Sequence, residues 1–351
     1  MNQAQKKPES SGKRIAWSLL FLLLACLSVW TVTTQAKGFS PRRFWEYIEG
    51  SHPWWLCAAF ASMLAYIFFD ALMVHCLLKG FSHARSLTNC VSYAAADLYF
   101  SAITPSATGG QPMEAYYMVK DGVPAIISTV VMLTYLLLYT LSIVIIGFIC
   151  LIFSPSTFLS FSVLGRVLIA VGAAIQLGLT VLYGMLLWNE GMLRRILHWA
   201  LRMLHKLHIV RNHEKRRQKL DVTMDEYAQA TRLLRGHRKL LWKTLLLNLS
   251  RRASHILVTV FCFLAGGGAL SQAPRLFAMQ SSVVIGASCI PIPGAMGVTD
   301  FLMLDGFSSL MDAQQAANLE ILARLTSFYI CILLCGIIVL VKSAILRLRK
   351  K

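Results

Sequence analysis

Two short stretches of this chain combine prolines, glycines and one carboxylate within apolar sequence. The first is TPSATGGQPME, residues 104–114, and the second is PIPGAMGVTD, residues 291–300. In both, the acid is the ninth residue after the first proline. Backbone that is not helical cannot face lipid, because its N–H and C=O groups would have no partners. At membrane depth each stretch must therefore be buried or line a wet cavity, and each is a candidate ligand site.

In the first stretch, Pro105 is expected to end a helix, since proline lacks an N–H and disfavours helix at the residue before it. The glycine pair permits unusual backbone conformations, and Pro112 suits the first turn of a new helix. That helix is expected to begin at Glu114, and its N-terminus could receive a phosphate. The alternative is a tight turn without a ligand. The candidate binding residues are Thr104, Pro105, Thr108, Gly109, Gly110, Gln111 and Glu114.

The second stretch ends on Asp300, and acids within a membrane are costly unless they are paired or functional. Three arginines are candidate partners for it, although the pair on the fifth apolar run could instead extend toward the membrane surface. Asp70, isolated among apolar residues, is expected to line the same cavity. The further candidate binding residues are Pro293, Gly294, Gly297, Asp300, Arg251, Arg252, Arg324 and Asp70.

The composition indicates an all-α polytopic membrane protein. Of 351 residues 56% are hydrophobic and only 14% are charged, whereas soluble domains carry charge at about a quarter of positions. The nine cysteines lie mostly in apolar runs without metal-ligand spacing, so we expect neither a metal nor any other cofactor.

The apolar runs predict about six membrane spans in a single integral membrane domain, residues 1–351. They lie at 15–34, 53–78, 123–152, 162–187, 244–265 and 320–342. The first run is longer than the apolar core of a cleaved signal peptide, so we interpret it as a span. Two interrupted runs, 86–119 and 274–312, contain the stretches described above.

The distribution of lysine and arginine orients these spans, because cytoplasmic loops carry the excess. Residues 1–14, the loop 189–243 and the tail 343–351, with Lys342 just before it, are basic and expected to be cytoplasmic. Residues 86–119 must then enter and leave from the cytoplasm, and 274–312 from outside. The sequence thus predicts two opposed re-entrant helical hairpins and a possible inverted repeat, the arrangement typical of a midplane transport site.

The loop 189–243 holds fourteen Lys and Arg against five Asp and Glu. This excess is the ordinary orientation signal, but it could also bind anionic lipid headgroups or the phosphates of tRNA. The apolar spacing within 192–207 is that of an amphipathic helix at the membrane surface.

The motifs TPSATGGQPMEAYYM (Thr104–Met118) and PIPGAMGVTDFLM (Pro291–Met303) resemble the lysylphosphatidylglycerol synthase transmembrane-region family, over nearly the whole chain. That family includes the membrane half of the multiple peptide resistance factor. The resemblance implies a bacterial cell membrane protein that moves lysyl-phosphatidylglycerol between leaflets. In the second motif of the family a Glu usually stands where this chain has Asp300.

Full-length relatives are implied to add a soluble domain that transfers lysine from lysyl-tRNA to phosphatidylglycerol. This chain ends soon after its last expected span, so we expect lysyl transfer to need a partner. Our first hypothesis is a translocator of phospholipid or of a related lipid-phosphate carrier, with membrane phospholipids as partners. The second is phosphatidylglycerol lysyltransferase, alone or with a partner enzyme, with tRNA as a further partner. The third is a lipid-binding subunit. A homo-oligomer is compatible with each.

Overall fold

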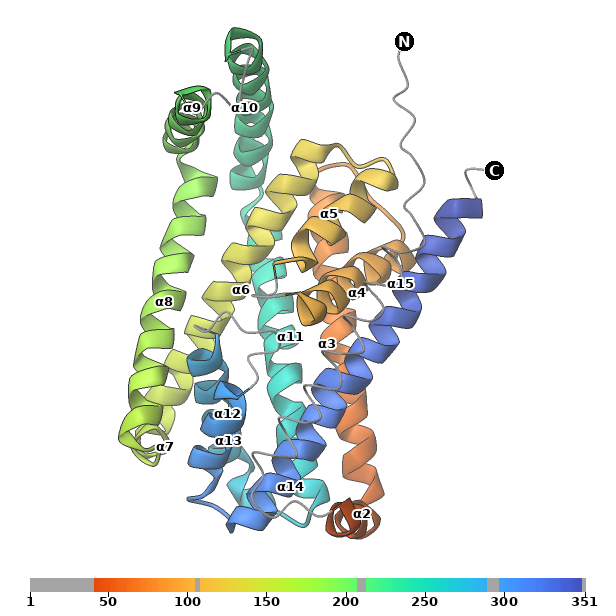
Figure 1. Cartoon of the computed structure of the whole chain (residues 1–351), viewed down its shortest axis with the longest axis vertical. Helices are drawn as coiled ribbons and strands as arrows, with labels where there is room; N and C mark the ends of the chain where they lie inside the picture. Colours follow the sequence, from red (N-terminus) through yellow and green to blue (C-terminus); the bar gives the residue numbers. More distant parts are fainter. Residues whose placement is uncertain (1–40, 105–107, 207–212, 289–296, 349–351) are drawn as a thin grey trace.

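The computed structural model of the chain describes residues 41–104, 108–206, 213–288 and 297–348. Every regular element in these residues is a helix (Figure 1). The first half contains α2 (Pro41–Glu49), α3 (Pro53–Gly80), α4 (Leu87–Ile103), α5 (Gly110–Lys120), α6 (Ala125–Phe153), α7 (Pro155–Leu159) and α8 (Val163–Trp188). The second half contains α9 (Glu190–Lys206), α10 (His213–Gly236), α11 (Arg238–Ala265), the short helix η2 (Leu270–Gln272), α12 (Ala273–Ala287), α13 (Val298–Phe307), α14 (Ala313–Arg324), η4 (Leu325–Ile330) and α15 (Cys331–Leu348).

Four described helices are long and apolar enough to cross a membrane, which confirms an all-α polytopic membrane fold. They are Pro53–Gly80, Ala125–Phe153, Val163–Trp188 and Ala313–Leu346, and each covers all or nearly all of one predicted span. The predicted span 244–265 lies in α11, which has 28 residues and is therefore about 42 Å long. The predicted span 15–34 lies outside the described residues.

Each interrupted run forms a pair of short helices. Helices α4 and α5 pack together near the end of the molecule that carries α9 and α10, and α12 and α13 pack together toward the opposite end (Figure 1). The predicted loop at 189–243 contains α9 and α10, which pack against each other. Helix α15 continues to Leu348, so the predicted polar tail begins inside a helix.

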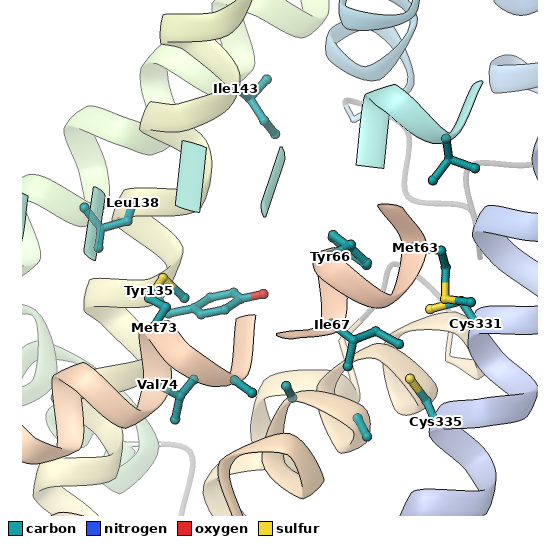
Figure 2. Close-up of a cluster of buried hydrophobic side chains, with 14 of the residues drawn as sticks. Met63, Tyr66, Ile67, Met73, Val74, Tyr135, Leu138, Ile143, Cys331 and Cys335 are labelled. Carbon is teal, nitrogen blue, oxygen red and sulfur yellow. The ribbon is translucent and has the colours of Figure 1, made fainter. Parts of the chain in front are cut away.

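Helices α4 and α11 pack against α3, and α6 and the η4 turn also contact it. Figure 2 shows Tyr135 of α6 on one side of this helix and Cys331 and Cys335 of α15 on the other, with Tyr66 and Ile67 between them. Tyr135, Cys335 and Ile67 are among the buried residues of this core. Helix α11 lies along α3 and runs in the opposite direction (Figure 1).

Lys342 is buried rather than part of a solvated tail. Its Nζ lies 2.6 Å from Asp121 Oδ2 and donates to Asn89 Oδ1 at 2.9 Å, while the Tyr93 hydroxyl also donates to Asp121 Oδ2 at 2.6 Å. These contacts join α15 to α4 and to the end of α5. A buried carboxylate and an amide therefore satisfy the charge of Lys342 inside a helix, and the cytoplasmic position of the tail that follows it stays a prediction.

Gly110 allows α5 to approach α4 closely. A Cβ at this position would lie 2.0 Å from Ser101 Oγ and 2.3 Å from Asp97 Oδ1. Gly109 has φ −84°, a conformation open to other residues. The expected need for unusual backbone angles at this pair was therefore wrong, and close packing explains Gly110 instead.

We predict that Gly110→Ala lowers the free energy of unfolding by about 1–3 kcal/mol, the usual cost of forcing extra atoms into a packed site. Thermal unfolding of the purified chain in detergent measures the change. Gly178→Ala is the matched control, because a Cβ there meets nothing within 4 Å. Equal melting temperatures for the two variants would contradict the account.

Candidate functional site

A cavity of about 570 Å³ lies where the two helix pairs approach each other. Its lining includes Ser101 from the end of α4, Ser288 just after α12 and Thr299 from the start of α13. Its walls come from α3, α6, α8, α11 and the helix α14–α15, and they are mainly apolar. The polar groups that set its chemistry are Gln176, Arg252, His255, Gln280 and Arg324.

Arg252 is the cavity arginine without an ion-pair partner in the described residues. Its side chain is 5% exposed, and its Nε and Nη2 make no hydrogen bond there. The guanidinium carbon lies 4.6 Å from the centre of the Tyr139 ring, a cation–π contact that supports the charge without neutralising it. A buried guanidinium with free N–H donors is suited to a carboxylate or phosphate ligand.

Arg324 faces the same cavity but is already paired. It forms ion pairs with Asp300 of α13 and with Glu320, where Nε lies 2.8 Å from Oε1. The described helix continues directly from Arg324 into the π-helical turn η4, and such turns are frequent at functional sites. Asp300 and Glu320 are buried beside Arg324 and are not in the cavity lining. This group of two carboxylates and one guanidinium is net negative when all three are ionised.

Asp300 also fixes the start of α13. Its Oδ2 accepts a hydrogen bond from the Gly297 N–H at 2.9 Å. Gly297 has φ +83°, in the left-handed region that favours glycine. Gly297 and Asp300 therefore hold the helix end that borders the cavity. Pro293 and Gly294 lie outside the described residues.

Arg251, the neighbour of Arg252, points away from the cavity lining. It is 2% exposed, and its Nε lies 3.3 Å from Oδ2 of Asp70, which is fully buried. Its Nη2 donates to the Tyr66 hydroxyl at 3.1 Å. Asp70 was expected to line the cavity, but it lies behind the lining and neutralises Arg251.

The three candidate arginines thus have different partners. Arg324 forms the expected pair with Asp300, whereas Arg251 pairs with Asp70 and Arg252 contacts Tyr139. Both Arg251 and Arg252 are buried. The alternative that they extend to the membrane surface was therefore wrong, because acidic and aromatic partners surround them.

In the first stretch, the Thr104 side chain makes its hydrogen bonds to neighbouring backbone groups. The Thr104 hydroxyl donates to the Phe100 carbonyl at 2.6 Å and accepts from the Gly109 N–H at 2.9 Å. Thr108 is exposed and Gln111 is half-buried, and Pro105 lies outside the described residues. None of the described candidate residues from this stretch is in the cavity lining, which α4 reaches through Leu98, Ser101 and Ala102.

Glu114 occupies a different position from the one expected. Helix α5 begins at Gly110, so Glu114 lies in its second turn rather than at its start. The side chain is fully buried, and neither carboxylate oxygen has a hydrogen-bond partner in the described residues. Glu114 therefore lies inside the protein, behind the cavity lining.

Several residues in or beside the cavity were not found from the sequence. His255 follows Arg251 by one helical turn, and Glu320 precedes Arg324 by the same interval, so helical spacing was the available signal for both. The His255 ring centre lies 5.0 Å from that of Tyr66. Gln176 and Gln280 are single amides in apolar helices, and their spacing from other polar residues did not identify them as site residues.

The long apolar helices are those of a multi-pass membrane protein. Between its two broken helix pairs lies a cavity with buried charged groups, which makes this region an internal polar site. Residues 15–335 match the family described as Lysylphosphatidylglycerol synthase TM region. Because the match covers most of the chain, the protein belongs to this family, as its motifs predicted. No curated protein sequence matches the chain.

We predict that Asp70→Asn strongly destabilises the protein, because it leaves the Arg251 charge buried without its counter-ion. Removing one partner of a buried pair costs about 3–5 kcal/mol. Thermal unfolding of Asp70→Asn, Arg251→Leu and the double variant measures this coupling, and the double variant should recover much of the loss.

Asp225→Asn is the control, since the Asp225 side chain paired with Arg194 is 65% exposed. An exposed pair contributes less than about 1 kcal/mol. If Asp70→Asn is as mild as this control, the ion pair does not hold α3 to α11.

Proposed function

We propose that the protein translocates phospholipid between membrane leaflets, with the headgroup passing through the cavity while the acyl chains remain in lipid. The observation that carries this proposal is Arg252, a buried guanidinium with free donors in an apolar-walled cavity. A lipid phosphate satisfies those donors. The mainly apolar walls suit the adjoining glycerol and upper acyl carbons.

The acidic groups behind the Arg324 side of the cavity support a headgroup that also carries an amine. Asp300 and Glu320 share the single guanidinium of Arg324, so an ammonium group gains the remaining negative charge. Lysyl-phosphatidylglycerol has both a phosphate and amines, and a related lipid-phosphate carrier would use the Arg252 side alone. The family membership supports a role in lipid chemistry.

The order of the helices supports alternating access. Each half has a long helix, a short helix pair and another long helix, and α3 and α11 run in opposite directions (Figure 1). Inverted halves of this kind can expose one site to either side in turn. Under this proposal they form one membrane domain, with residues 86–119 entering from one side and 274–312 from the other.

The charge distribution supports an orientation. The basic region 189–243, with α9 and α10, faces the cytoplasm together with both termini. The membrane is then the bacterial cell membrane, where a positively charged lipid in the outer leaflet would protect against cationic peptides. The family membership and the distribution of lysine and arginine support these assignments.

Phosphatidylglycerol lysyltransferase activity remains the alternative, directly or through a partner enzyme that uses lysyl-tRNA. Purified chain incubated with lysyl-tRNA and phosphatidylglycerol tests it by the formation of lysyl-phosphatidylglycerol. Product formed by this chain alone would replace the translocator as the primary function.

We predict that Arg252→Gln slows translocation at least tenfold. Hydrogen bonds between charged groups contribute about 1.5–3 kcal/mol, and 1.4 kcal/mol is a factor of about ten. The measurement is the rate at which labelled lysyl-phosphatidylglycerol becomes accessible in the outer leaflet of vesicles that contain the full chain.

Arg275→Gln is the control because Arg275 is exposed on α12 and outside the cavity lining. It should retain the wild-type rate. Translocation that survives both Arg252→Gln and Asp300→Asn would remove the cavity from the transport route, and the absence of translocation by the wild-type chain would contradict the function itself.

A further inference from the structure

Behind the cavity lies a second buried cluster of charged groups. Asp70 of α3, Asp97 of α4, Glu114 of α5 and Arg251 of α11 are each at most 5% exposed. Glu114 interacts electrostatically with the other three. The cluster therefore brings three carboxyl groups and one guanidinium into one buried region.

These charges do not balance if every group is ionised. The ion pair between Arg251 and Asp70 uses the positive charge, which leaves two carboxyl groups without a counter-ion. Asp97 has donors for its oxygens, with the Tyr135 hydroxyl at 3.2 Å from Oδ2 and the Ser101 hydroxyl at 3.4 Å from Oδ1. Glu114 has none on either oxygen in the described residues.

In the described residues no second cation neutralises the charge that Glu114 carries when it is ionised. Its one cationic partner is Arg251, and Lys342 is engaged by Asp121 at the end of α5. The other titratable groups that interact with the cluster are hydroxyls and thiols, which are neutral donors or hydrophobes. They are Tyr66 on α3, Cys90 on α4, Tyr135 on α6 and Cys335 on α15.

The cluster is connected to the cavity through α4. Ser101 lines the cavity and also donates to Asp97. The start of α5 packs against the same Asp97 oxygen, since a Cβ on Gly110 would lie 2.3 Å from it. Asp97 thus lies between the cavity and Glu114, within reach of a proton that enters from the cavity.

We infer that Glu114 is a proton-binding site that couples the pH gradient across the membrane to movement of the two halves. In the resting form its carboxyl carries a proton taken from water, which leaves Asp97, held by two hydroxyl donors, as the one carboxylate of the cluster without a counter-ion. When the O–H bond breaks, the proton leaves through Asp97 and the cavity, and a carboxylate remains. That carboxylate competes with Asp70 for Arg251, which changes the packing of α11 against α3 and α5.

Infrared difference spectroscopy of the full chain in lipid tests the proton site without any transport. The wild-type spectrum minus that of Glu114→Gln, at neutral pH, should show the C=O stretching band of a protonated carboxyl group. Glu49→Gln is the control because Glu49 is exposed, and the same subtraction should show an ionised carboxylate only. A carboxylate band for Glu114 would overturn the proposal.

Glu114→Gln is expected to fold, since glutamine has the shape of the protonated acid. If it does not, titration of the wild-type band with pH decides the question: the protonated band must lose intensity as pH rises. A wild-type spectrum with no protonated buried carboxyl at neutral pH would overturn the proposal without any variant.

The coupling rests on the proposed translocation and is tested separately. Vesicles containing labelled lysyl-phosphatidylglycerol are compared with and without a pH gradient. The wild-type rate should change at least threefold with the gradient, and for Glu114→Gln the ratio of the two rates should fall to one. A wild-type ratio of one contradicts coupling. No lipid movement at all contradicts the function, and the infrared band then still reports the proton site.

Discussion

The ion pair between Asp70 and Arg251 is the interaction on which the rest of the structure depends. It joins α3 to α11, which are the first long helices of the two halves of the molecule. Both side chains of the pair are buried. The rings of Tyr66 and Tyr135 lie 4.6 and 5.3 Å from the same guanidinium. An isolated charge in such a place is strongly unfavourable, so each helix needs the other to bury its charge.

The two broken helix pairs pack against this joined core and set the limits of the cavity. Their ends must satisfy backbone groups internally, because lipid offers no partners. Thr104 closes the first break through two hydrogen bonds, and Asp300 closes the start of α13 on Gly297. Asp300 has a double role, since the side chain that caps the helix also binds Arg324. Arg324 is thus paired with Asp300 as well as Glu320, and among the described residues Arg252 is the cavity arginine without a counter-ion.

The sequence was sufficient to predict the apolar helices and the positions of the broken segments. Run length predicts spans, and the prolines and glycines predict interruptions, because both signals are local. The pairing of the arginines was not accessible in this way. Arg251 and Arg252 are adjacent in sequence but point roughly 100° apart around a helix, so one meets Asp70 and the other the cavity. Which side faces which partner depends on the rotation of α11 against α3 and α6. Lys342 shows the same limit, because its partners Asn89 and Asp121 lie far away in the chain.

The central claim is that the cavity holds a lipid headgroup with its phosphate on Arg252. An experimental structure of the full chain in a bilayer that contains lysyl-phosphatidylglycerol tests it most directly. The account predicts phosphate density within hydrogen-bonding distance of the Arg252 guanidinium and the amine directed toward Asp300 and Glu320. A cavity that contains only water or closed side chains at saturating lipid, with headgroups confined to the two membrane surfaces, would contradict it.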